Sequence, residues 1–175
     1  MNLPVVMTVI GRDQPGLVEA VSAVIEKHQG NWEESQMAHL AGHFAGILKV
    51  ELPAANLAGF KGDLTTLESR GLSVHITDEE SPGKKTDQGS KITLELVAHD
   101  QPGIVHRISQ VLATHQINVE TFESHCESAP WSGERLFKSL IELRIPDDST
   151  IEKLRADLEK IAEELMVDFN LRQAL

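Results

Sequence analysis

The sequence has a single cysteine, Cys126, so no disulfide can form within the chain. It also has no apolar run near the roughly 18–20 residues that a membrane-spanning helix needs. Pro4 and Arg12 interrupt the apolar residues at its start, where a secretory signal would carry a continuous apolar segment. We therefore expect a cytoplasmic protein that does not enter a membrane.

Positive charge is scarce as well. Lys and Arg number 16 against 27 Asp and Glu, which gives a net charge of −11, and no stretch of the chain forms a basic stripe. Proteins that bind DNA or RNA directly neutralise phosphates with clustered Lys and Arg. We therefore expect no direct contact with nucleic acid, so that any effect on transcription would pass through another protein.

Motifs that hold cofactors or perform catalysis are missing too. The chain has no Walker-type phosphate loop, no nucleophile elbow and no dinucleotide fingerprint. His39 and His43 have a spacing that suits metal ligands on a helix, but they fall on either side of an expected strand turn. We therefore expect no enzymatic activity, no metal and no cofactor.

The remaining reactive side chains have ordinary structural explanations. His28 and His115 are expected in the last turn of a helix, where a cation complements the helix dipole. Cys126 is expected to be a small core residue of a strand. Trp131 falls in a polar excursion, 127–135, and is expected to be exposed on a contact surface.

The sequence does contain a long internal repeat. Asp-Gln-Pro-Gly occurs at 13–16 and again at 100–103, and residues 7–34 and 94–121 share 11 of 28 positions at a shift of 87 residues. A repeat of this length predicts two copies of one structural unit. We expect the first unit at 1–78 and the second at 91–175. A polar linker that contains Pro82-Gly83 is expected between them, at 79–90.

Hydrophobic periodicity gives both copies the same order of elements, βαββαβ. Strands are expected at 3–10, 31–40, 44–52 and 72–77 in the first copy, and at 91–98, 118–125, 137–145 and 166–171 in the second. Helices are expected at 17–28, 57–70, 103–115 and 149–165. This order predicts an α+β fold of two ferredoxin-like units, each an antiparallel sheet with two helices on one face. Because sheet edges and one sheet face stay uncovered, we expect a homo-oligomer.

The repeated tetrapeptide is the candidate ligand site. It joins the first strand to the first helix, so the unpaired N–H groups of the helix point into the loop and favour a carboxylate. Asp13 and Asp100 could accept hydrogen bonds from an ammonium group, and the sheet could bring Asn31 and Asn118 beside the loops. The alternative is that Asp before Pro-Gly is an ordinary helix cap and turn residue that needs no ligand, and composition alone favours this alternative.

In the two copies, a strand is followed by Arg-Asp-Gln-Pro-Gly-Leu-Val or His-Asp-Gln-Pro-Gly-Ile-Val, and then by a helix and an Asn. This pattern resembles the ACT domain, a regulatory amino-acid-binding module. In that family the ligand lies near the first loop and first helix, between paired domains. The resemblance implies these ligand-binding residues: Asp13, Gly16, Leu17, Asn31, Asp100, Gly103, Ile104 and Asn118. Serine-binding members resemble His-x-Asn-x-x-Gly at this loop, whereas this chain has Asp in place of the Asn, so which amino acid binds, and whether any does, stays open.

The chain has two such units and no enzyme domain, and its second unit contains Ala-Pro-Trp-Ser-Gly-Glu-Arg-Leu-Phe at 129–137. In these features it is similar to the bacterial family of glycine cleavage system transcriptional repressors. This resemblance implies a regulator that responds to a free amino acid, glycine or a similar one. It would repress transcription of the glycine cleavage genes by contacting a DNA-binding transcription factor. Two alternatives stay open: a non-catalytic protein-interaction module, and a detached regulatory subunit of an enzyme of amino-acid metabolism.

Overall fold

The computed structural model of the chain describes residues 1–77, 89–146 and 148–173. The chain divides into two compact units, unit 1 (Met1–Lys84) and unit 2 (Lys85–Leu175). Most of the expected linker, 79–90, lies outside the described residues. Ser90, its last position, already belongs to a strand of unit 2.

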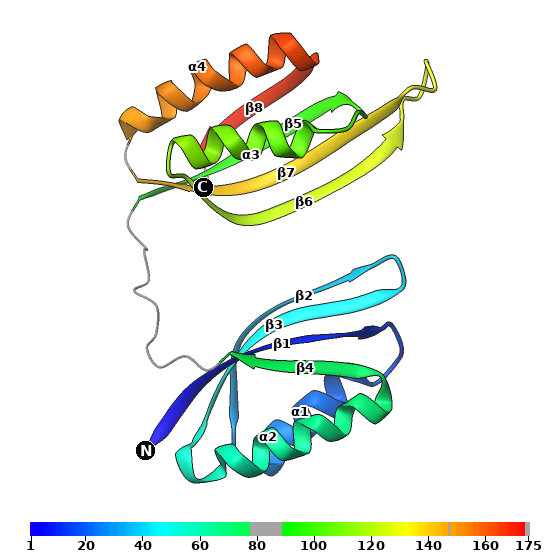
Figure 1. Ribbon diagram of the computed structural model, residues 1–175, viewed down its shortest axis with the longest axis vertical. Coiled ribbons are helices and arrows are strands. Elements are labelled where there is room, and N and C mark those ends of the chain that lie inside the picture. Colours follow the sequence, from blue (N-terminus) through cyan, green and yellow to red (C-terminus); the bar gives the residue numbers. More distant parts are fainter. Residues whose placement is uncertain (78–88, 147, 174–175) are drawn as a thin grey trace. The chain divides into compact units, whose positions relative to one another are not determined.

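Unit 1 contains four strands and two α-helices in the expected order (Figure 1). The antiparallel sheet has the strand order β2-β3-β1-β4. The second helix is shorter than expected because its last turn tightens into a 3₁₀ helix, which ends at Gly71 in the left-handed conformation. The elements are β1 (Asn2–Arg12), α1 (Leu17–Lys27), β2 (Asn31–Leu40), β3 (His43–Pro53), η1 (Ala54–Asn56), α2 (Leu57–Thr66), η2 (Leu67–Arg70) and β4 (Leu72–Thr77).

Unit 2 repeats this arrangement, with the strand order β6-β7-β5-β8 in an antiparallel sheet. The prediction of two ferredoxin-like units, each with two helices on one face of its sheet, is therefore confirmed (Figure 1). The elements are β5 (Ser90–His99), α3 (Ile104–Thr114), β6 (Asn118–Ser128), β7 (Arg135–Ile145), α4 (Asp148–Leu165) and β8 (Val167–Gln173). No helix among the described residues is long and apolar enough to cross a membrane.

Each unit has its own hydrophobic core between the sheet and its helices. Alternate residues of the central strand β1 are buried against the helices, and the residues between them lie on the opposite face of the sheet, away from the helices of the unit. The largest fully buried side chain of unit 1 is Phe60 of α2. The buried residues of β1 and β3 are Val5, Met7, Val9, Leu48, Val50 and Leu52.

Three connections meet at one end of each sheet. In unit 1, Arg12 pairs with His43 and Gly11 pairs with Leu72, so the 13–16 loop, the β2–β3 turn and the start of β4 share that end. In unit 2 the 100–103 loop, the β6–β7 hairpin and the start of β8 meet in the same way. The hairpin connection is shorter than expected, residues 129–134, because β6 and β7 extend to Ser128 and Arg135.

Candidate ligand-binding site

Both repeated loops end at a glycine in the left-handed conformation. Gly16 has φ 91° and Gly103 has φ 95°, and each is the N-cap of its helix without a hydrogen bond from a capping side chain. Glycine adopts this conformation at little cost, whereas other residues are strained there. Asp13 and Asp100 therefore do not cap the helices, so the capping part of the structural alternative is wrong, and the first N–H groups of α1 and α3 have no side-chain cap.

The two aspartates instead attach the loops to the neighbouring hairpins. The N–H of Asp13 donates to the carbonyl of Gly42 (3.0 Å), and its carboxylate lies 3.5 Å from Nε2 of His39. In unit 2, the N–H of Asp100 donates to the carbonyl of Arg135 (2.9 Å), and Nε of Arg135 donates to the Asp100 carboxylate (3.1 Å). Asp100 thereby raises the pKa of Arg135. Asp100 is thus paired with a full cation, and Asp13 with a histidine.

The glutamine of each tetrapeptide makes the second attachment of the loop. Nε2 of Gln14 donates to the backbone carbonyl of Arg70 (2.8 Å), and Nε2 of Gln101 donates to the carbonyl of Leu165 (3.2 Å). These equivalent bonds tie each loop to the end of the second helix of its unit. The sequence analysis missed this role, although the identity of Gln14 and Gln101 within the repeat was a signal for it.

Unit 1 has an open cleft of about 480 Å³ beside its loop. The cleft brings together the start of α1, the guanidinium-bearing Arg70 and the carboxylate-bearing Glu19. A helix N-terminus and a cation favour a carboxylate, while an anion favours an ammonium group. The cleft therefore offers both charges that a free amino acid needs. Its lining residues are Gln14, Pro15, Gly16, Leu17, Glu19, Ala20, Ser69 and Arg70.

The expected loop residues take different places around this cleft. Gly16 and Leu17 line it, but the side chain of Leu17 is buried in the core, as is that of Ile104 in unit 2, so these residues present their backbone. Asp13 is not among the lining residues. Sequence reasoning missed Glu19, Ser69 and Arg70, because Ser69 and Arg70 are separated from the loop by most of the unit in sequence.

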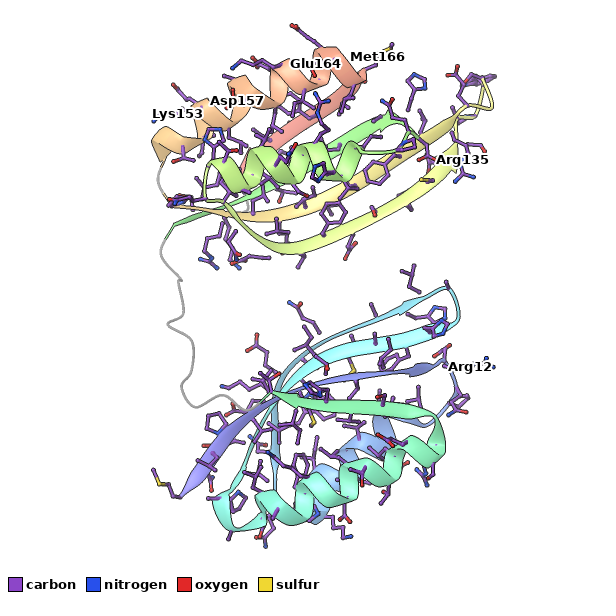
Figure 2. All side chains as sticks on the ribbon, viewed as in Figure 1. Arg12, Arg135, Lys153, Asp157, Glu164 and Met166 are labelled. Atoms are coloured by element: carbon purple, nitrogen blue, oxygen red, sulfur yellow. The ribbon has the colours of Figure 1, made fainter. Side chains whose placement is uncertain are left out.

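Unit 2 lacks the corresponding charges. The repeat aligns Glu19 with His106, and the equivalent glutamine bonds place Leu165 where unit 1 has Arg70. The one arginine in the first turn of α3, Arg107, forms an ion pair with Glu164 of α4 (Figure 2). The two loops thus share their backbone conformation but not their surrounding chemistry.

The sheet does not bring Asn31 and Asn118 beside the loops, so this expectation was wrong. Asn31 pairs with Glu51, which pairs with Pro4 at the far end of β1 from the loop. At about 3.3 Å per residue, Asn31 lies roughly 30 Å along the sheet from Asp13. Asn118 has the same position in unit 2, where it pairs with Arg144. An antiparallel βαβ order puts the start of the second strand at the opposite end of the sheet, because the helix has carried the chain there.

Other predicted side chains also differ from expectation. Cys126 is exposed, so its prediction as a core residue was wrong, because the helix layer does not cover the edge strand β6. Trp131 is 99% exposed at the tip of the β6–β7 hairpin, as predicted. His28 and His115 do more than complement a helix dipole: each is half-buried and contacts an aspartate of the neighbouring helix. No group of three or more His, Cys, Asp or Glu among the described residues is placed to hold a metal.

Each of the two units matches a known protein family. Profiles of the ACT domain match residues 4–77 and 92–163. A UPF0237 protein from Methanopyrus kandleri is 38% identical over 53 residues, which span 30% of this chain and 59% of that protein. A UPF0237 protein from Lactococcus lactis is 28% identical over 75 residues, 42% of this chain and 86% of that protein.

Two solved structures are similar over nearly the whole chain. A protein of unknown function from Galdieria sulphuraria is 27% identical with a TM-score of 0.84, and both chains are covered completely. A protein proposed to be a glycine cleavage system transcriptional repressor is 18% identical with a TM-score of 0.73, over 99% of this chain and 98% of that one. At this identity the second likeness establishes the fold. Together with the two profile matches and the repeated βαββαβ units, these similarities show that the chain belongs to the ACT-domain family, with two ACT domains in tandem.

Proposed function

We propose that this chain is a non-catalytic regulator that binds a free amino acid, glycine or one of similar size. It represses transcription of the glycine cleavage genes through a DNA-binding transcription factor and does not bind DNA itself. The observation that carries the ligand-binding part is the cleft of unit 1, where the uncapped start of α1, Arg70 and Glu19 meet.

Unit 1 is the sensing unit in this proposal. The ligand carboxylate accepts hydrogen bonds from the backbone N–H groups near Gly16 and Leu17 and pairs with Arg70, while the ammonium group pairs with Glu19. Asp13 acts indirectly, because its contacts with Gly42 and His39 attach the loop to the neighbouring hairpin.

Unit 2 supports the fold and contacts other proteins. Asp100 is paired with Arg135, while Gly103 and Ile104 supply the same helix start, beside which the cation Arg107 is already paired with Glu164. Asn31 and Asn118 have no part in either loop. The exposed Trp131 at the hairpin tip is a side chain that commonly anchors protein–protein contacts.

A protein partner fits the charge of the chain better than nucleic acid does. A net charge of −11 repels DNA phosphates, whereas it attracts the basic surface that a DNA-binding protein presents. The fold shared with a proposed repressor of the glycine cleavage system supports the regulatory part of the proposal.

Affinity capture of the tagged full chain from lysate, with and without millimolar glycine, tests this proposal. We expect a DNA-binding transcription factor to be recovered, in an amount that glycine changes, and we expect Trp131→Ala to reduce its recovery. Recovery of an enzyme of amino-acid metabolism without any transcription factor would contradict the repressor function and favour a regulatory subunit.

The specific observation for the second candidate, a plain interaction module, is that both loops are tied down by protein groups at Asp and Gln. This candidate predicts that glycine leaves partner recovery unchanged. It also predicts that Arg70→Gln leaves partner recovery unchanged. Among the described residues, Arg70 accepts the Gln14 hydrogen bond with its backbone carbonyl and not with its side chain.

A further inference from the structure

The turn between the second and third strands differs in length between the units. Two residues, 41 and 42, connect β2 to β3 in unit 1, whereas six residues, 129–134, connect β6 to β7 in unit 2. The hairpin of unit 2 also runs past the neighbouring strand β5, whose last residue, His99, pairs with Leu136. The turn therefore projects beyond the end of β5 (Figure 1). We name residues 129–134 the Trp131 finger.

Hydrogen bonds within the Trp131 finger give it a defined conformation. The N–H of Ala129 donates to the carbonyl of Glu134 (2.8 Å), and the N–H of Gly133 donates to the carbonyl of Ala129 (3.0 Å). The Ser132 hydroxyl accepts the N–H of Glu134 (3.3 Å), and Gly133 adopts the left-handed conformation, with φ 72°. A turn that is ordered before it binds a partner loses little conformational freedom on binding.

The base of the Trp131 finger is fixed to the 100–103 loop. Arg135, the first residue after the finger, accepts the N–H of Asp100 with its carbonyl and pairs with the Asp100 carboxylate through its guanidinium. In unit 1, Asp13 makes only the backbone bond to its short turn, at the carbonyl of Gly42. The loop of unit 2, which lacks the charges of the unit 1 cleft, thus holds the finger in place.

The Trp131 finger exposes an aromatic ring and a carboxylate. The Trp131 side chain is 99% exposed. The Glu134 side chain is 60% exposed and has no Lys or Arg partner among the described residues, whereas the nearby Asp100 is paired with Arg135. An indole face attracts a cation, and a carboxylate pairs with a guanidinium or an ammonium group. The finger therefore offers two groups that favour a positively charged side chain.

We infer that the Trp131 finger binds a basic surface of the protein partner, where a Lys or Arg of the partner lies on the Trp131 indole and pairs with Glu134. Proteins that bind DNA present clusters of Lys and Arg for the phosphates, so a transcription factor has such a surface. The inference rests on the proposed function, because it supplies the contact through which the chain holds a DNA-binding protein.

Other occupants of the finger fit its charge less well. Nucleic acid and a second copy of this chain are both negatively charged, and Glu134 and the net charge of −11 repel them. An entirely apolar pocket would remove water from the Glu134 carboxylate without supplying an opposite charge.

Fluorescence of the full chain tests the chemistry of the finger. Trp32→Phe leaves Trp131 as the only tryptophan, because the chain has two. We expect an octa-arginine peptide to change the Trp131 emission with saturation, and a Gly-Ser peptide of equal length to leave it unchanged. Glu134→Gln should weaken octa-arginine binding about two- to fivefold, since it removes one exposed ion pair.

Glu152→Gln is the matched control for Glu134→Gln and should leave octa-arginine binding unchanged. Glu152 is an exposed glutamate of α4 without an ion pair among the described residues. Circular dichroism confirms that each variant is folded. Unchanged Trp131 emission, or equal weakening by Glu134→Gln and Glu152→Gln, would overturn the inference.

Photo-crosslinking in cells tests the partner. With p-benzoylphenylalanine in place of Trp131 in the full chain, we expect one protein to be cross-linked, through a segment that contains Lys or Arg. Glu134→Gln should reduce the yield, and Glu152→Gln should not. The absence of a cross-linked protein, a cross-link to a second copy of this chain, or a yield that Glu134→Gln leaves unchanged would overturn the inference.

The same experiment separates this inference from the proposed function. A partner that is cross-linked through Lys or Arg but does not bind DNA would support the inference and contradict the proposed repressor. A transcription factor that affinity capture recovers but that position 131 does not cross-link would contradict the inference and leave the proposed function standing.

Discussion

At the scale of single residues, two glutamines end the first helix of each unit in a conformation that normally favours glycine. Gln29 has φ 58° and Gln116 has φ 54°. The residue after each donates its N–H back to the helix, Gly30 to the carbonyl of Ile25 (2.8 Å) and Ile117 to that of Leu112 (3.0 Å). This is the Schellman motif, in which a left-handed residue turns the chain out of the helix.

Gln29→Gly and Gln116→Gly should therefore stabilise the protein. The left-handed conformation destabilises a residue with a Cβ by roughly 1–2 kcal/mol, and glycine removes this strain. Glycine also has greater freedom in the unfolded chain, which offsets about half of that stabilisation. We expect a gain of about 0.5–1 kcal/mol for each substitution in urea-induced unfolding. Gln29→Ala and Gln116→Ala are the controls, because alanine keeps the strain. Equal effects of glycine and alanine would show that the conformation is not strained.

At the scale of elements, the same histidine–aspartate pair joins the two helices of each unit. Nε2 of His28 lies 2.7 Å from the carboxylate of Asp63 on α2. In unit 2, Nε2 of His115 lies 2.9 Å from the carboxylate of Asp157 on α4, which is labelled in Figure 2. The His28 ring also packs edge-on against Phe60. These pairs fix the helices to each other above the core, at positions far apart in each repeat.

The pairs give the stability of the fold a pH dependence. Lys27 first and His28 second hold the pKa of Asp63 below its ordinary value, and Lys160 and His115 do the same for Asp157. A lowered carboxyl pKa in the folded state stabilises it above the unfolded-state value of about 3.9. That stability is lost as the pH falls through the lower folded-state pKa.

We therefore expect the double variant Asp63→Asn, Asp157→Asn to be less stable than the unmodified chain at pH 7, and the difference to shrink as the pH falls below about 4. Melting temperatures measured from pH 7 to low pH check this. Glu26→Gln is a suitable control, since this exposed glutamate has no ion pair among the described residues. A difference that stays constant with pH would show that the aspartates act by packing and not by charge.

The elements could be predicted from the sequence almost completely, but the site could not. Apolar periodicity is a local signal, and the repeat doubled it, so strands such as 31–40 match the structure at both ends. The cleft lies between the loop and Arg70, which are far apart in the sequence. They come together only when the unit folds. The sequence analysis placed Asn31 beside the loop for the same reason. The end of the sheet at which Asn31 lies follows from the direction of its strand and not from its closeness to Gly16 in sequence.

At the scale of the whole molecule, duplication has kept one framework and changed two surfaces. The loops keep the same glycine conformation and the same glutamine attachment in both units, whereas Arg70 and Glu19 occur only beside the first. The sheet faces away from the helices diverge in the same way: Thr8, Ile10 and Ile47 lie at the middle of this face in unit 1, whereas the face of unit 2 carries Glu95, Glu123 and Asp168. One unit thus carries the features expected of a ligand site, while the other keeps the framework with a different surface.

The melting temperature of the full chain with and without glycine tests the central claim most directly. A ligand that binds only the folded state stabilises it by RT ln(1 + [L]/Kd), about 2.7 kcal/mol at 100 times Kd. We predict that millimolar glycine raises the melting temperature, that Arg70→Gln abolishes the rise, and that Arg107→Gln, beside the loop of unit 2, leaves it intact. If neither glycine nor any other proteinogenic amino acid raises the melting temperature, the chain is not an amino-acid sensor.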